Sequence, residues 1–123
     1  MTGLGLDLCE VARIEAALHN SEGFLERYYT AEERVYLEAR GKTSAQSAAA
    51  MFAAKEAFMK ALGTGLSGGV AMADVGVIHD ELGRPSYALA GAASALMAQR
   101  GAKTAYLSLT HDAGVAVAVC ILE

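Results

Sequence analysis

Cysteine, proline and long apolar runs are all scarce in this chain of 123 residues. The two cysteines, Cys9 and Cys120, lie in short apolar segments that are typical of strands. We therefore expect buried, reduced thiols and a cytoplasmic protein. They could form a disulfide only if their strands are neighbours, which the sequence leaves open. The only proline, Pro85, favours the first position of a strand or an edge strand.

The sequence features of membrane proteins and of nucleic-acid-binding proteins are also missing. Hydrophobic residues make up 54% of the chain, but no stretch approaches the roughly 20 apolar residues that a membrane span requires. The opening MTGLGLDL is typical of a strand and not of a signal peptide. The net charge is −4 and the basic residues form no long run, which argues against a nucleic acid as the main partner. We expect a single domain over residues 1–123, large enough to bury a core of its own.

The order of strand and helix patterns predicts an α+β fold. We expect strands at 3–9, 75–79, 85–89, 103–110 and 115–122, and helices at 10–19, about 24–28, 30 to about 41, 44–62 and 91–100. Ser21 is a predicted helix cap, and Thr30 and Thr43 are predicted caps with Glu33 and Gln46 at capping-box spacing. The last two strands are predicted to turn at residues 111–114. This order implies helices packed on a mostly antiparallel sheet.

The segment 52–65, FAAKEAFMKALGTG, places charged residues on an otherwise apolar helix. A buried stripe is predicted from the spacing of Met51, Phe58 and Leu62. Glu56 and Lys60 are four residues apart and share another face, while Lys55 lies between the two sets without an assigned role. Taken alone, a Glu–Lys pair at this spacing favours an ordinary solubilising salt bridge, worth about 0.3–0.5 kcal/mol.

The glycines after this helix match a nucleotide-binding pattern in letters only. Gly63, Gly65 and Gly68 fit G-x-G-x-x-G, but a dinucleotide site needs these glycines between a strand and the start of a helix, and here they follow a helix. No G-K-S/T follows them, which argues against a P-loop. We interpret Gly63 as the stop of the long helix.

Two other kinds of site have weak support. His19, His79 and His111 are scattered, without the spacing of a zinc enzyme. A Ser–His–Asp set could be assembled from Ser108, His111 and Asp112, but no nucleophile-elbow motif is present.

Two acidic residues suit a hard cation better. Asp7 interrupts an apolar strand, so it is either a solvent position on an edge strand or a ligand. Magnesium is usually held by one or two carboxylates, with water and substrate phosphates completing its octahedron. Asp7 and Glu56 would supply the carboxylates, and Lys60, one helical turn beyond Glu56, could neutralise phosphate oxygens.

Three blocks of the chain resemble holo-[acyl-carrier-protein] synthase, the small bacterial family of 4′-phosphopantetheinyl transferases. They are G-x-D-x-x-x-x-x-R-I at 5–14, F-A-A-K-E-A-F-x-K-A-x-G-T-G at 52–65 and S-L-T-H at 108–111, with Gly83-Arg84-Pro85 as a shorter fourth element. Together they span nearly the whole chain in the family's order. One position departs from the pattern. Met51 stands where the family usually has arginine, so a contact is lost or a residue such as Arg40 or Lys42 replaces it.

The resemblance implies an activity. The phosphopantetheine arm of coenzyme A would be transferred to a serine of an apo acyl carrier protein, with release of adenosine 3′,5′-bisphosphate. Asp7 and Glu56 would hold Mg²⁺ against the pyrophosphate, and Lys60 would stabilise charge on the transferred phosphate. The base that takes the serine proton is open between Glu56 and a metal-bound water. The substrate pocket is expected to be lined by Lys60, Gly63, Arg84, Pro85, Ser108 and His111.

The resemblance also implies partners. It suggests a homotrimer with pockets between subunits, so that Asp7 and Glu56 of one chain face His111 or Arg84 of another. Carrier proteins are acidic, so a basic docking surface is needed despite the net charge. Its predicted members are Arg13, Arg27 and Phe24, of which Phe24 is equally well explained as a core residue. A fatty-acid or a polyketide carrier would fit equally. The competing hypotheses are a binding module without turnover and a structural trimerisation domain.

Overall fold

The computed structural model describes residues 1–64 and 69–123. The helices are α1 (Val11–Asn20), α2 (Phe24–Tyr28), α3 (Ala31–Ala39), α4 (Ser44–Leu62) and α5 (Gly91–Gln99), and two short 3-10 turns are η1 (Gly41–Thr43) and η3 (Met72–Asp74). The strands are β1 (Gly3–Glu10), β2 (Val75–His79), β3 (Pro85–Leu89), β4 (Ala105–Asp112) and β5 (Val115–Leu122). The predicted α+β architecture is confirmed, and Pro85 begins its strand as expected.

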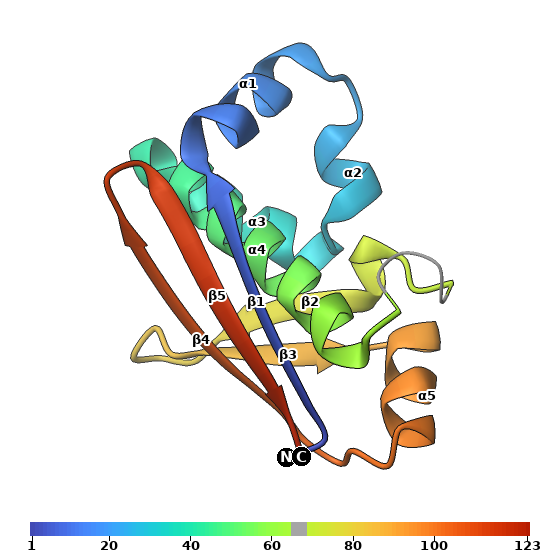
Figure 1. Cartoon of the computed structure of the whole chain (residues 1–123). Coiled ribbons are helices and arrows are strands. Elements are labelled where there is room, and N and C mark those ends of the chain that lie inside the picture. The colour runs from blue at the N-terminus through green and yellow to red at the C-terminus, as the bar shows by residue number, and fades with distance from the viewer. Residues whose placement is uncertain (65–68) are drawn as a thin grey trace.

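The strands form two antiparallel sheets, one in the order β1-β5-β4 and one of β2 and β3. Figure 1 shows the long helix α4 running behind the three-stranded sheet, with the early helices α1, α2 and α3 on the side of α4 away from α5. α4 packs mainly on β1 and β5, and also on α1, α3 and β2. It therefore packs on both sheets and on two of the early helices, and β3 also packs directly on β4. None of the helices in the two described ranges is long and apolar enough to cross a membrane.

Glycines on β1 let this strand lie against the backbone of α4. A Cβ atom on Gly5 would lie 1.8 Å from the carbonyl oxygen of Ala57, and one on Gly3 would lie 2.3 Å from that of Ala61. Side chains alternate along a strand, so Asp7 shares the face of Gly3 and Gly5 that meets α4. Strand β1 is an edge strand, yet its solvent face carries leucines and not the aspartate. The most exposed of these are Leu4, Leu6 and Leu8, at 57%, 61% and 67%.

Several local predictions can be compared with the structure directly. The capping box of Thr30 and Glu33 is present, and Gly63 ends α4 in the left-handed conformation with φ 80°. Ser21 does not cap α2, because Gly23 occupies the N-cap position without a side-chain bond. Thr43 makes no cap bond to α4, since its hydroxyl donates to the Arg40 carbonyl. These two capping predictions are wrong.

The final hairpin turns later than predicted. His111 and Asp112 belong to β4 and pair with Ala116 and Val115 of β5. The turn consists of Ala113 and Gly114 alone, which both have positive φ, at 50° and 79°. A two-residue turn of this kind matches the twist of the two strands, so the ladder continues up to it.

The cysteines are buried and free, as expected. Their strands are neighbours, but Cys9 lies opposite Ala116 and Cys120 opposite Gly5, so the two thiols are not paired in register.

Candidate active site

Asp7 and Lys60 form an ion pair between β1 and α4. Lys60 Nζ donates to Asp7 Oδ1 at 2.8 Å and to the Leu6 carbonyl oxygen at 3.2 Å. The Asp7 side chain is only 10% exposed, whereas that of Lys60 is 55% exposed. The ammonium group therefore reaches the carboxylate and remains open to a ligand from solvent.

Glu56 joins this pair from the preceding turn of α4. Its carboxyl group is close enough to that of Asp7 for the Asp7 charge to act on it. Partial burial raises the pKa of Glu56, the negative charge of Asp7 raises it further, and Arg13 and Lys60 oppose the shift. Two neighbouring carboxyl groups repel each other when both are ionised, and a cation bound by both would remove that repulsion.

These donors fit magnesium better than zinc. Among the described residues there is no group of three or more histidine, cysteine, aspartate or glutamate side chains placed to hold a metal. Magnesium needs fewer protein ligands, because one or two carboxylates suffice when water and substrate phosphates complete the octahedron. Asp7 and Glu56 could supply this set, with Lys60 beside them in contact with Asp7.

A separate pocket of about 150 Å³ lies beside the first half of α4. Its walls are Arg40, Gln46, Ser47, Ala50, Met51, His79, Leu109, Thr110 and His111. His111 Nδ1 hydrogen-bonds to the side-chain amide of Gln46. These lining residues include no acidic residue. They carry one guanidinium group, two imidazole rings, two hydroxyl groups and one side-chain amide. The pocket therefore suits an anionic ligand.

The other residues predicted to line the pocket lie elsewhere. Ser108 lies with Tyr106 and Val119 at a shallow hollow on the sheet. Arg84 is in the turn between β2 and β3, where its backbone N–H donates to Asp80 Oδ1 at 2.8 Å, and Pro85 pairs with His79. Gly63 serves as the end of α4, and Gly65 and Gly68 lie outside the described residues. Within one chain, none of these residues lines the pocket that contains His111, although Pro85 is paired with the lining residue His79.

Sequence reasoning missed His79 as a wall of this pocket. Its ring stacks on that of Tyr36 in α3, with the centroids 4.1 Å apart and the planes 3° from parallel. In the described part of the chain, His79 Nδ1 is buried without a hydrogen-bond partner. No local pattern links Tyr36 to His79, because the contact exists only when α3 and β2 pack together.

His79 also predicts how stability depends on pH. Burial lowers the pKa of His79, and the nearby Arg40 lowers it further. In the unfolded chain the pKa of His79 is about 6.5, so just below this pH the unfolded chain binds a proton that the folded chain does not bind. Stability should fall as pH drops below about 6.5, by at most about 1.4 kcal/mol per pH unit for one proton. In His79→Phe, which keeps the stacked ring, the free energy of unfolding measured in urea should depend less on pH than in the wild type. The same pH dependence in both proteins would contradict this.

Known proteins resemble this chain over nearly its whole length. Residues 3–120 match the family model of the 4'-phosphopantetheinyl transferase superfamily. A holo-[acyl-carrier-protein] synthase of Geotalea daltonii is 43% identical over 122 residues, which cover 98% of this chain and 97% of the relative.

Two solved structures extend the similarity to the fold. The holo-[acyl-carrier-protein] synthase of Neisseria meningitidis has a TM-score of 0.89 and 32% identity, and the match covers 100% of this chain and 98% of that one. The Helicobacter pylori enzyme in complex with coenzyme A has a TM-score of 0.82 and 30% identity, with 98% and 99% covered.

Proposed function

The chain belongs to the 4'-phosphopantetheinyl transferase superfamily, and we propose that it transfers the 4′-phosphopantetheine arm of coenzyme A to a serine of an apo acyl carrier protein. The observation that carries the proposal is the proximity of Asp7, Glu56 and Lys60, since two carboxylates could hold a divalent cation and the exposed ammonium group beside them could bind the pyrophosphate. The serine oxygen would form a bond to the phosphorus of the phosphopantetheine arm. The bond to the nucleotide would break, and adenosine 3′,5′-bisphosphate would leave.

Asp7, Glu56 and Lys60 would have different roles in this transfer. Asp7 and Glu56 would hold magnesium, which when bound would neutralise charge on the pyrophosphate. Lys60 would donate to a phosphate oxygen as negative charge gathers there. The serine proton must be accepted, and among the chain's carboxylates described here Glu56 has the raised pKa that favours this role.

A transfer assay tests the proposal. The protein is incubated with coenzyme A and an apo acyl carrier protein, with magnesium or with a chelator, and the carrier is weighed by mass spectrometry. We expect a mass gain on the carrier only with magnesium, together with release of adenosine 3′,5′-bisphosphate. Absence of transfer to several fatty-acid and polyketide carriers, with coenzyme A still bound, would instead favour a binding module without turnover.

We propose that the carrier docks on an aromatic cluster bordered by two exposed arginines. Phe24 lies 5.1 Å from Tyr28 and 6.3 Å from Phe52, measured between ring centroids. Arg13 lies 5.7 Å from the centroid of Phe52, and Arg27 lies 5.9 Å from that of Tyr28. Phe24 is partly buried in this cluster, so it packs on the core and still reaches the surface.

Charge reversal tests this docking surface. In Arg13→Glu the KM for the acidic carrier should rise about tenfold, since a rim charge acts mainly on association, while the KM for coenzyme A should change little. The control is Lys103→Glu, which makes the same change at an exposed position outside the cluster. Equal increases in both KM values would show that Arg13 is not a docking residue.

We further propose that the chain forms a homotrimer in a reducing cytoplasm. The outer face of the sheet exposes Leu4, Leu6, Leu8 and Tyr106. Such an apolar surface is typical of a subunit interface. Arg84 and Pro85 are not among the residues that line the pocket of their own chain, so a neighbouring subunit would be the route by which they reach a nucleotide.

Leu6→Asp should disrupt this assembly. A charge at the centre of an apolar interface is left without a partner, so the trimer should dissociate. The mass measured by light scattering after size exclusion should fall from three chains to one. The control is Val35→Asp on α3, an exposed position outside the sheet. A wild-type monomer, or an unaltered mass in Leu6→Asp, would contradict the trimer.

A further inference from the structure

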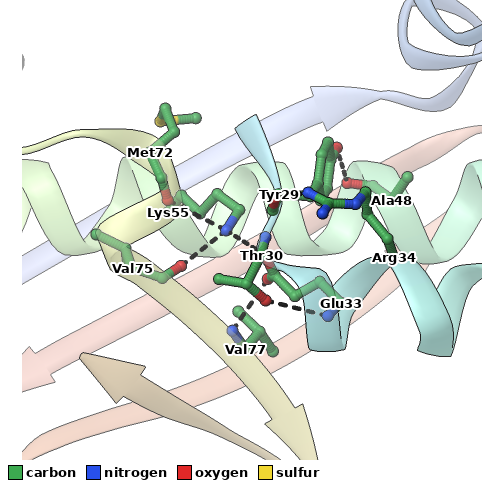
Figure 2. Close-up of polar contacts among 9 residues, drawn as sticks. All are labelled: Tyr29, Thr30, Glu33, Arg34, Ala48, Lys55, Met72, Val75 and Val77. Carbon is green, nitrogen blue, oxygen red and sulfur yellow. Dashed lines mark hydrogen bonds and ion pairs between the residues drawn. The ribbon is translucent and has the colours of Figure 1, made fainter. Parts of the chain in front are cut away.

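Lys55 is the charged residue of the 52–65 segment that the proposed chemistry does not use. Its side chain is fully buried in the core. Its Nζ donates to Glu33 Oε1 at 2.7 Å, to the Val75 carbonyl oxygen at 2.8 Å and to the Met72 carbonyl oxygen at 3.2 Å (Figure 2). An ammonium group has three donors, and each of them has an acceptor here.

Glu33 carries the other half of this network. Its Oε1 also accepts from the backbone N–H of Thr30 at 2.8 Å, and its Oε2 accepts from that of Val77 at 3.0 Å (Figure 2). One carboxylate thus contacts the start of α3, the middle of α4 and strand β2. A buried ion pair is weak evidence for stability, because desolvation of both charges offsets their attraction, so a role in fixing the arrangement of these elements is worth testing.

The three connected elements, together with β4, supply the walls of the pocket that suits an anionic ligand. Met51 lies one helical turn before Lys55 on α4, Arg40 directly follows α3, and His79 ends β2. All three residues line the pocket that contains His111. Tyr36 connects the α3 and β2 sides, because its ring stacks on His79 and lies 5.4 Å from the guanidinium carbon of Arg40. The ion pair therefore connects the Arg40 and His79 wall to the α4 wall.

We propose that Lys55 and Glu33 are positioning residues for this pocket. They hold Arg40 and His79 opposite Met51 and His111, and so set the affinity for the anionic nucleotide part of coenzyme A. This inference rests on the proposed function, which makes the nucleotide the ligand. Neither residue contacts the substrate, since the Lys55 side chain is fully enclosed and Glu33 is buried as well.

Nucleotide binding tests the inference. The variants are Lys55→Met, which keeps most of the unbranched side chain but removes the charged amine, and Glu33→Gln, which keeps its size and one acceptor oxygen. Calorimetry with adenosine 3′,5′-bisphosphate should give a Kd about tenfold higher in each, as expected when about one hydrogen bond to a charged group is lost. Binding is measured at a temperature at which circular dichroism shows each variant to be folded.

A matched control separates positioning from general destabilisation. Tyr87→Phe removes the bond from the Tyr87 hydroxyl to the Ala54 carbonyl of α4 at 2.6 Å, one residue from Lys55 but facing β3. Its Kd should equal that of the wild type. Unchanged Kd values in Lys55→Met and Glu33→Gln, with only a lower melting temperature, would overturn the inference and leave a purely structural pair.

NMR titration of the His79 ring gives a second readout. In the wild type its pKa is lowered by burial and by Arg40. In Lys55→Met the pKa of His79 should move toward the ordinary value of about 6.5, because the wall that contains Arg40 and His79 is held less firmly. In Tyr87→Phe the pKa of His79 should equal that of the wild type. If the wild type binds no nucleotide, the proposed function fails as well. If the wild type binds and Lys55→Met retains both the same Kd and the same His79 titration, the positioning role alone is wrong.

Discussion

Replacement of Glu56 by glutamine is expected to lower kcat for phosphopantetheine transfer by about 10²–10³-fold or more. Glutamine keeps the shape of the side chain but removes the charge that would hold magnesium and accept the serine proton. Loss of a single group that stabilises developing charge typically has an effect of this size. The rate is measured by carrier mass gain over time at saturating substrates, and Asp7→Asn should show a similar loss.

The same variant should not weaken the fold. The pKa of Glu56 is raised by burial and by Asp7, so the folded protein favours the protonated form. Its stability then increases as pH falls from that raised pKa to the ordinary pKa of the unfolded chain, and above the raised pKa the ionised Glu56 is unfavourable. Glu56→Gln should therefore melt at the same temperature as the wild type or at a higher one, as is common for active-site charges.

A control variant and a metal titration make this result specific. Glu38→Gln removes one negative charge from an exposed position of α3 and should leave kcat unchanged. Calorimetry with Mg²⁺ should show weaker binding in Glu56→Gln than in Glu38→Gln. Full activity in Glu56→Gln, or a lost activity that accompanies unfolding, would remove Glu56 from the proposed site.

Local features of the fold could be predicted because the sequence carries them within a few residues. The long helix has a periodic stripe and a glycine stop, and the box of Thr30 and Glu33 needs only a spacing of three. The caps at Ser21 and Thr43 failed for the same local reason. Spacing does not reveal a competing acceptor, and the Thr43 hydroxyl finds one in the Arg40 carbonyl of the preceding 3-10 turn.

The candidate site could be predicted only in part. Glu56 and Lys60 share a helix face by spacing, but Asp7 meets them because Gly3 and Gly5 let β1 approach α4, and no periodicity shows that approach. The family resemblance placed Asp7 with Glu56 and Lys60, since its sequence blocks include both segments. The position of Ser108 or Arg84 relative to a neighbouring subunit is not contained in the fold of one chain.

Lys55 shows how far a buried contact can be predicted from local sequence. Its position four residues after Met51 and four before Met59 places it on the buried face of α4, which was a usable signal. A buried charge requires a partner, but Glu33 lies 22 residues earlier and on another helix. The capping-box role of Glu33 was predicted, whereas its contacts with Lys55 and Val77 depend on how α3, α4 and β2 pack.

The buried pair should have a large effect on stability when only one partner is removed. Lys55→Met leaves Glu33 as an uncompensated buried carboxylate and deprives the Met72 and Val75 carbonyls of their donor. Breaking a buried pair in this way costs about 3–5 kcal/mol, against a total stability of about 5–15 kcal/mol for a small domain. Urea unfolding followed by circular dichroism should show this decrease in the free energy of unfolding.

The same substitution in the next turn of α4 provides the comparison. Lys60→Met breaks the ion pair with Asp7, but the Lys60 side chain is 55% exposed, so the loss should be below about 1 kcal/mol. The double variant Lys55→Met, Glu33→Gln should be more stable than Lys55→Met alone, because it no longer contains a buried charge without a partner. Additive losses in the double variant, or equal losses in Lys55→Met and Lys60→Met, would mean that charge compensation inside the core is not what Lys55 provides. A double variant that recovers stability while its nucleotide Kd stays high would separate the two roles, because the charge balance would be restored without the bonds that hold β2 to α4.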